Sequence, residues 1–233
     1  MAAITKKTVI GVTLQMGLED IWKFLTIEQQ EILLDEAVHR IYEKGEYIYQ
    51  VGDGSNYLVC ILRGRVKLEK AGAGGRMQII RMLRTCEFFG YRSYFASQSH
   101  STSAVAIDHT IAALIPMKVI EIITTRNPKL AMYFIRALSL DLGVSDERTV
   151  SLTQKHIRGR LADALLFLID KYGWEADGRT LNAYLSRDEI AALSNMTTSN
   201  AIRTLSAFEK EGLIKMDGRK IVILDFNAVK ENS

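Results

Sequence analysis

The segment that most constrains the fold is Leu185 to Gly212, where two short helical patterns lie close together. Ser186, with Glu189 three residues later, forms a capping box at the start of the first pattern. Residues 194–195 then interrupt the apolar spacing, and Gly212 follows the second pattern, where a helix C-terminus favours glycine. A short helix, a tight break and a longer helix predict a helix-turn-helix.

The second helix leaves small polar side chains on its outer face. Thr197 or Thr198 can cap it. Short hydrogen-bonding groups near a helix N-terminus, followed one turn later by an arginine, suit base edges and phosphates in the major groove of DNA. The candidate DNA-reading residues of this helix are Thr197, Thr198, Ser199, Asn200 and Arg203.

A β-hairpin is predicted directly after the two helices. Asp217-Gly218 is a two-residue hairpin signal between alternating apolar strands. A hairpin in this position is typical of a wing, with Arg219 and Lys220 near its tip facing phosphate. Arg187, at the start of the first helix, is a further candidate DNA contact. The alternative interpretation is a small helical domain with a hairpin and no nucleic acid.

Bulk charge does not indicate a nucleic-acid-binding protein. The net charge of the 233 residues is only +3, and from Lys155 onward twelve Lys and Arg face eleven Asp and Glu, which leaves +1. A basic surface must therefore come from the placement of a few side chains, namely Arg187, Arg203, Lys215, Arg219 and Lys220.

Cysteine content and hydropathy indicate in which cellular compartment the protein is expected. Cys60 and Cys86 are too few for a disulfide scaffold, and Cys60 lies in an apolar run that favours burial. No basic start followed by an apolar run marks a signal peptide, and no segment approaches the roughly 20 apolar residues of a membrane span. We expect a cytoplasmic protein that makes no contact with a membrane.

Residues 1–15 show no clear pattern, but from Val38 to Ile115 short apolar runs alternate with glycine-bearing breaks. Strands with turns about every 8–12 residues are typical of a sandwich or barrel. The 48% hydrophobic content is enough for a substantial core.

A long helix is predicted from Asn127-Pro128 to about Gln154. It would span about 40 Å at about 1.5 Å per residue, which is long for a helix within one domain. Because the pattern is apolar on two sides, we expect one side to pack on the barrel and the other on a second copy of the chain; the alternative is burial wholly within one domain. The heptad seam consists of Ala131, Ile135, Leu138, Leu142, Ser145, Thr149 and Leu152.

This order of parts resembles the Crp/Fnr family of bacterial transcription regulators, from about Leu25 to Leu224. The motifs that carry the resemblance are KGEYIYQVGD, YLVCILRGRVKL, EFFGYRSYFA, SAVAIDHTIAALIP, HIRGRLADALLFL and, most specifically, LSRDEIAALSNMTTSNAIRTLSAFEKEGLI. The resemblance implies an α+β fold in three parts. They are an N-terminal sensor β-barrel of the jelly-roll, cyclic-nucleotide-binding type in residues 1–126, a dimerisation helix in 127–154 and a winged helix-turn-helix in 155–233.

The effector implied by the resemblance is not cyclic AMP. Members that bind cyclic AMP hold its ribose with a Gly-Glu pair and its phosphate with an Arg-Ser pair, whereas this chain has Gly90-Tyr91 and about His100-Ser101 at those places. Losing both groups removes the ribose acceptor and the charge-assisted phosphate contact. A different polar ligand would contact candidate effector residues Gly90, Tyr91, Arg92, His100, Ser101, Ser145 and Asp146.

Of the other cofactors found in the family, the sequence argues against an iron–sulfur cluster and leaves haem open. With no cysteine before Cys60, a four-thiolate iron–sulfur cluster in one protomer is excluded, and no metal-ligand spacing is found. Haem stays open, since some members bind it, and the alternative for each histidine is a surface or capping role. The histidines are His39, His100, His109 and His156.

The family's base-reading positions fall on Thr198, Ser199 and Arg203, of which only Arg203 matches the cyclic-AMP-binding members. The resemblance therefore implies a different target sequence in double-stranded DNA, read by a homodimer, with RNA polymerase as a further partner of an activator. The competing hypothesis is a nucleotide- or haem-binding module acting on a protein partner. An enzyme is not indicated, because no nucleophile–base pair or phosphate-cradling motif is found.

Overall fold

The computed structural model describes residues 14–233, which divide into two compact units. The first contains the chain up to Lys70 together with Ile80–Leu142, and the second contains Ala71–Ile79 and Gly143–Ser233. Of the N-terminal segment without a clear pattern, residues 1–13 lie outside the described residues.

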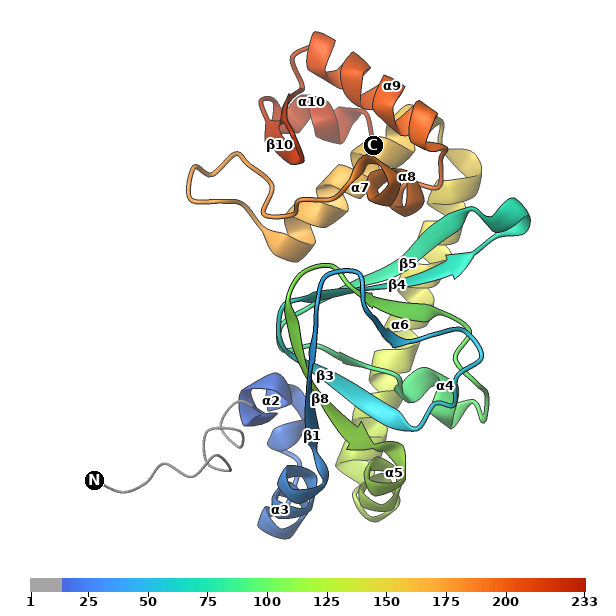
Figure 1. Cartoon of the computed structure of the whole chain (residues 1–233), viewed down its shortest axis with the longest axis vertical. Helices are drawn as coiled ribbons and strands as arrows, with labels where there is room; N and C mark the ends of the chain where they lie inside the picture. The colour runs from blue at the N-terminus through green and yellow to red at the C-terminus, as the bar shows by residue number, and fades with distance from the viewer. Residues whose placement is uncertain (1–13) are drawn as a thin grey trace. The chain divides into compact units, whose positions relative to one another are not determined.

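Two four-stranded sheets form most of the first unit (Figure 1). Their orders are β1–β8–β3–β6 and β2–β7–β4–β5, so neighbours in space are mostly distant in sequence. Within the described residues the two sheets do not join into one closed ladder, and the predicted barrel is a jelly-roll-like double sheet. The strands are β1 (Val38–Tyr42), β2 (Tyr47–Tyr49), β3 (Tyr57–Arg63), β4 (Arg65–Ala71), β5 (Met77–Arg84), β6 (Phe88–Phe89), β7 (Ser103–Ala106) and β8 (Thr110–Pro116).

Alternation along β3 divides its side chains between two cores. Val59 and Ile61 face the second sheet, in a core that they share with Val66 of β4 and Phe89 of β6. Cys60 faces the opposite side and is fully buried against the helices, as its apolar run predicts. The strand is therefore covered on both faces, which explains its nearly continuous apolar sequence.

Short helices cover the outer face of the first sheet. They are α2 (Glu19–Trp22), α3 (Ile27–Glu36), α4 (Tyr91–Phe95) and α5 (Met117–Arg126). The spacing of Thr26 and Gln29 predicts a capping box at the start of α3. The Thr26 hydroxyl accepts a hydrogen bond from the Gln29 amide at 3.3 Å, and the Gln29 side chain accepts from the Thr26 amide at 3.1 Å, which confirms it. Proline suits the first turn of a helix, but Pro116 is the last residue of β8 and the N-cap residue that precedes α5.

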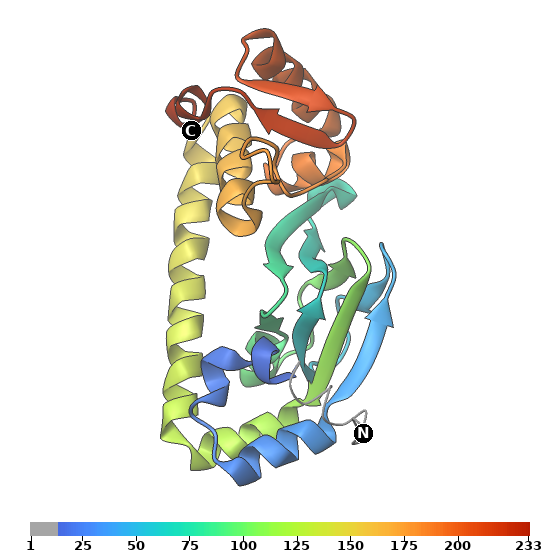
Figure 2. The ribbon, with the colours of Figure 1, turned by 90° about the vertical axis from the view of Figure 1, so that its left-hand side faces the viewer.

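Helix α6 (Pro128–Gln154) is continuous over 27 residues (Figure 2). It begins at the predicted place, where Asn127 Oδ1 accepts a hydrogen bond from the Leu130 amide at 3.3 Å. Phe134 is buried in the core between the first sheet and its helices, the core that also contains Cys60. Ile135 and Leu142 are 53% and 64% exposed. The helix therefore buries one apolar side and leaves another open in the single chain.

The second unit contains the predicted helix-turn-helix and hairpin. Its elements are η1 (Ala73–Gly75), α7 (Ile157–Tyr172), α8 (Arg187–Leu193), α9 (Thr198–Lys210), β9 (Ile214–Asp217), β10 (Lys220–Ile223) and α10 (Phe226–Glu231). Ser186 and Glu189 form the expected capping box, and Thr197 is the residue that caps α9. Gly212 has φ +76° just beyond α9, a conformation that glycine adopts without strain.

Two local boundaries differ from the sequence prediction. The apolar spacing of residues 160–172 predicts a helix that follows a polar junction at residues 154–158. Helix α7 instead begins at Ile157, so the junction after α6 shortens to residues 155–156. Asp217 pairs with Lys220, which makes Gly218 and Arg219 the two turn residues of the wing and moves the turn by one position. Gly218 has φ +58°, and this requirement for positive φ at the first turn residue fixes the register.

Replacing Phe208 by alanine is expected to destabilise the second unit by about 3–5 kcal/mol, because a fully buried aromatic ring is removed from its core. The measurement is urea unfolding followed by Trp174 fluorescence in a Trp22→Phe background, which leaves Trp174 as the sole tryptophan. Ile202→Ala, at an exposed position of the same helix, is the control and should cost about 0.5 kcal/mol. Equal losses in the two variants would contradict the assigned orientation of α9.

Candidate functional site

The orientation of α9 follows from its buried face. Leu205 and Phe208 are buried, and the Arg158 guanidinium lies over the Phe208 ring at 4.9 Å. Arg158 also donates two hydrogen bonds to the Glu211 carboxylate, at 2.8 and 2.7 Å. These contacts connect α9 to α7 and leave Arg203 on the exposed side.

The turn between α8 and α9 is held by arginines. Arg160 Nη1 donates to the Asn195 carbonyl at 2.9 Å, and Arg148 Nη2 donates to the Leu193 carbonyl at 3.0 Å. Asn195 has φ +50°, which asparagine tolerates better than most residues. The arginines satisfy carbonyls that the end of α8 leaves without helical partners.

The predicted reading face is preorganised by side-chain hydrogen bonds. Thr197 Oγ1 accepts from the Asn200 amide at 3.2 Å, and Thr198 Oγ1 donates to Asp188 Oδ1 at 2.6 Å. The Arg203 guanidinium donates to the Asn200 side-chain oxygen, and Ser199 is exposed. The structure therefore brings these five predicted residues together on the first turns of α9.

The wing is attached to the start of α8. Arg187 Nη2 donates to the Gly218 carbonyl in the wing turn at 2.9 Å, so Arg187 positions the hairpin as well as offering charge. Lys220 Nζ lies 3.4 Å from the Glu175 carboxylate and 5.5 Å from the Tyr184 ring centre. Arg219 is exposed in the turn.

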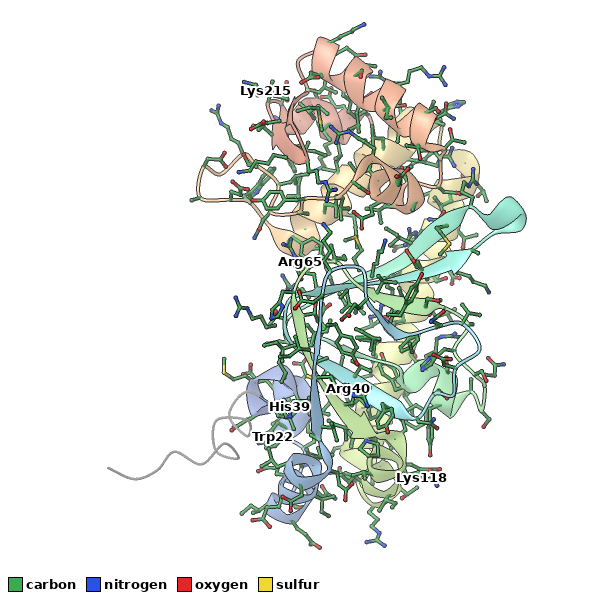
Figure 3. All side chains as sticks on the ribbon, in the orientation of Figure 1. Trp22, His39, Arg40, Arg65, Lys118 and Lys215 are labelled. Atoms are coloured by element: carbon green, nitrogen blue, oxygen red, sulfur yellow. The ribbon has the colours of Figure 1, made fainter. Side chains whose placement is uncertain are left out.

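Lys215 extends from the other strand of the wing, β9 (Figure 3). With Arg203 and Arg219 it provides exposed positive charge on the second unit. Two carboxylates contact the predicted site and were not predicted with it, Asp188 and Glu175. No local pattern could have found them, because their partners are 10 and 45 residues away along the chain.

The first candidate effector residue along the chain is Gly90, whose backbone passes close to the backbone of Tyr57. Gly90 has φ +100°, and a Cβ atom there would lie 2.5 Å from the Tyr57 carbonyl oxygen. Only glycine fits this position, which starts α4 and directs the next side chain inward. Tyr91 is accordingly buried.

Tyr91 belongs to a polar cluster whose members are distant in the sequence. Its hydroxyl donates to Asp141 Oδ2 at 3.4 Å, and Arg81 Nη1 binds the same oxygen at 2.6 Å. Burial first, and then the Asp141 charge, raise the pKa of Tyr91. Asp141 lies on α6 sixty residues from Arg81, so only the tertiary fold brings the pair together.

The remaining effector candidates of this unit also meet. The Arg92 guanidinium donates to the Ser101 hydroxyl. His100 is 5% exposed, and its ring stacks on Tyr49 at 3.6 Å between centres and 5° between planes. Burial raises the pKa of Tyr49 to about 12, against the opposing effects of a hydrogen bond with Thr102 and the charges of Arg92 and Arg81.

Two effector candidates belong to the second unit. Ser145 and Asp146 occupy exposed positions on α6. The histidines considered for haem lie on separate elements: His39 on β1, His100 before β7, His109 before β8 and His156 at the start of α7. His109 Nδ1 lies 3.0 Å from the Glu43 carboxylate.

Comparison with known proteins places a domain type on each part of the chain. The sequence model of the cyclic nucleotide-binding domain matches residues 39–127, and that of the Crp-like helix-turn-helix domain matches residues 159–231. No helix in residues 14–233 is long and apolar enough to cross a membrane.

Relatives of known role span nearly the same length. Electron transport regulator A of Shewanella oneidensis is 27% identical over 195 residues, covering 82% of this chain and 78% of that protein. Transcriptional activator protein Anr of Pseudomonas protegens is 26% identical over 206 residues, covering 86% and 83%. The solved structure of FixK2 from Bradyrhizobium japonicum superposes with a TM-score of 0.76 at 23% identity, covering 84% and 97%.

A cyclic-nucleotide-binding-type domain followed by a Crp-like helix-turn-helix defines a transcription regulator with a sensing domain. The chain belongs to the Crp/Fnr family of DNA-binding transcription regulators.

The His100 ring is expected to titrate below 6.5, because its burial lowers the pKa. Asp53 raises this pKa and Arg92 lowers it, so Asp53→Asn should shift the midpoint further down and Arg92→Gln should shift it up. The unfolded chain then binds the proton at higher pH, and the folded state loses stability as pH falls from above 6.5 through the lowered pKa. NMR titration of the ring signal, assigned with His100→Gln, tests this; a midpoint at or above 6.5 would contradict it.

Proposed function

We propose that the protein is a homodimeric transcription regulator that reads a near-palindromic DNA site and responds to an effector other than cyclic AMP. The observation that carries the proposal is the preorganised polar face of α9, where Asn200 orients the Arg203 guanidinium on the exposed side. A guanidinium held in one plane suits the two acceptors of a guanine edge. Thr198 and Ser199 supply short groups beside it.

Dimerisation is supported by the open apolar side of α6. Ile135 and Leu142 are seven residues apart, one heptad, and both are exposed in the single chain. Pairing two copies of α6 would bury this seam. Two recognition helices related by such an axis would enter major grooves about 34 Å apart, and the DNA site would repeat that symmetry.

Regulation is proposed as a population shift. An effector held in residues 90–101 would favour one arrangement of the sensor domain (1–126) relative to the dimer helix (127–154). The junction at residues 155–156 would then reorient the DNA-binding domain (155–233). Such an effector must bind one arrangement more tightly than the other, since equal affinity shifts no equilibrium.

We exclude cyclic AMP because of the residues that stand at the two positions where other members of the family bind its ribose and its phosphate. Tyr91 stands in place of the ribose-binding carboxylate, and its hydroxyl is hydrogen-bonded to Asp141. His100 and Ser101 follow α4 without an arginine at either position.

We also propose action in the cytoplasm, with RNA polymerase as a partner if the protein is an activator. A module acting only on a protein partner is not favoured, because its DNA-reading face would have no role.

The function is tested by selection from a random duplex library with purified protein at fixed physiological salt, first without added ligand. Fixed salt matters because phosphate contacts make affinity steeply dependent on ionic strength. Recovery of a palindromic site would support the proposal. If no sequence is enriched either alone or after addition of cell extract, haem and nucleotides, the proposal fails.

Arg203→Ala is expected to weaken binding to the selected site by about 1–3 kcal/mol and to relax the preference at one base pair, because a bidentate guanine contact is lost. The measurement is a titration of cognate and random duplexes at one salt concentration. Arg179→Ala, at an exposed loop arginine outside α9, is the control and should change neither affinity by more than about 0.5 kcal/mol. An equal loss on both duplexes would make Arg203 a phosphate contact.

Leu142→Glu is expected to convert the dimer to monomer, since two like charges would meet on the proposed seam. Leu140→Glu is a matched control: Leu140 is 72% exposed on the same helix but, at about 100° per residue, lies about 200° around the axis from Leu142. Analytical ultracentrifugation measures the association. Dissociation by both variants, or by neither, would remove α6 as the dimer contact.

A further inference from the structure

Thr197 and Thr198 are adjacent at the start of α9, but their hydroxyls have different hydrogen-bond partners. Thr197 is the N-cap residue, and its oxygen accepts from the Asn200 amide at 3.2 Å. Thr198 is the first residue of the helix, and its hydroxyl donates to Asp188 Oδ1 of α8 at 2.6 Å. The Thr198 hydroxyl therefore has no capping role and is bound instead by a side chain of the neighbouring helix.

The contact with Asp188 fixes the polarity of the Thr198 hydroxyl. A threonine oxygen carries one proton and two acceptor lone pairs, whereas a carboxylate can only accept. The proton must therefore lie between the two oxygens, and the charged acceptor makes this bond stronger than one between neutral groups. A threonine without such a partner can offer a ligand its proton or its lone pairs. Thr198 offers lone pairs only.

Two neighbouring side chains on the same face of α9 act as donors. The Arg203 guanidinium carries N–H groups and no acceptor. The side-chain oxygen of Asn200 already accepts from Arg203, so Asn200 meets a ligand mainly with its amide N–H groups. Thr198 is therefore an acceptor placed beside donors.

An acceptor on a recognition helix distinguishes amino bases from keto bases. In the major groove, adenine N6 and cytosine N4 donate hydrogen bonds, whereas thymine O4 and guanine O6 accept them. A hydroxyl that can only accept pairs with the amino group. Opposite a keto oxygen it would leave two acceptors with no proton between them, and a desolvated polar group without a partner costs free energy.

We propose that Asp188 is a positioning residue for DNA reading: by holding the Thr198 proton, it restricts Thr198 to adenine or cytosine at one position in each half of the palindromic site. This inference rests on the proposed function, because it names the bases that one residue of the reading face accepts. Asp188 lies in the first turn of α8, and the first helix of a helix-turn-helix crosses the phosphate backbone. Its charge therefore weakens general affinity for DNA while it sharpens selectivity.

The test repeats the selection from random duplexes with full-length variants at one salt concentration. Asp188→Asn keeps the size of the side chain, but its amide nitrogen can donate to Thr198 and free the hydroxyl proton. Thr198→Val removes the hydroxyl and keeps the branched shape, whereas Thr198→Ser keeps the hydroxyl. Asp170→Asn, at an exposed position of α7, removes the same charge away from α9 and is the matched control. Thr197 still caps α9 in every variant.

We expect the wild-type site to contain one position in each half where adenine and cytosine are preferred over thymine and guanine by about tenfold, the discrimination of one base contact. The preference should be lost in Thr198→Val and Asp188→Asn and persist in Thr198→Ser and Asp170→Asn. Combining Asp188→Asn with Thr198→Val should cost no more than Thr198→Val alone, because both changes act through one hydroxyl.

Affinity for random duplexes gives a readout that a purely structural role would not produce. Asp188→Asn should raise this affinity by about two- to fivefold relative to Asp170→Asn, the scale of one exposed charge pair, because a carboxylate is removed from beside the phosphates. If Asp188 only stabilised the N-terminus of α8, its removal would weaken random and selected binding together. Such parallel weakening would overturn the inference.

The same selection separates this inference from the proposed function. A palindromic site whose base preferences are unchanged by Asp188→Asn or by Thr198→Val would overturn only the role of Asp188, and the regulator would stand. Enrichment of no sequence under any condition would remove the proposed function and this inference with it.

Discussion

Burial of Phe208 is the contact on which the reading face depends. A fully buried phenylalanine contributes about 1.5–3 kcal/mol. An exposed ion pair such as Arg158–Glu211 contributes little, because water screens both charges. The ring therefore determines how α9 is rotated, and the ion pair adds geometry by placing the guanidinium over the ring. Once Leu205 and Phe208 face inward, helical spacing puts Ser199 and Arg203 on the exposed side. The polar surface of α9 is a consequence of its apolar anchor.

Local signals made the helical part of the fold predictable. Both capping boxes, the start of α6 at Pro128 and the glycine after α9 are determined within a few residues. The sheets were predicted only as a class. The order of their strands depends on pairings such as Tyr57 with Pro116, which no local pattern specifies. The early start of α7 was missed because His156 precedes it without a side-chain cap.

The candidate sites show the same division. Positions of the reading residues follow from the spacing of α9, but their partners do not: the Thr198 contact with Asp188 depends on how α8 crosses α9. In the first unit, Gly90, Tyr91 and Arg92 could be identified along the chain, whereas Arg81 and Asp141 could not, because their pairing joins a strand to a helix sixty residues away. The site residues themselves can be identified along the chain, whether exposed like Arg203 or buried like Tyr91, but most of the groups that hold them in place cannot.

The near-neutral charge of the second unit has a structural counterpart. Arg158, Lys155 and Lys220 are each paired with a carboxylate, and a phosphate would have to compete with Glu211, Asp163 or Glu175 for them. Non-specific affinity for DNA scales with the number of phosphates that a protein neutralises. Internal pairing therefore weakens sequence-independent binding. The Arg203 guanidinium differs, since its partner on α9 is the neutral Asn200 amide, which orients it without cancelling its charge. Such a distribution favours discrimination between base pairs over general attraction to DNA, as a regulator with a net charge of only +3 requires.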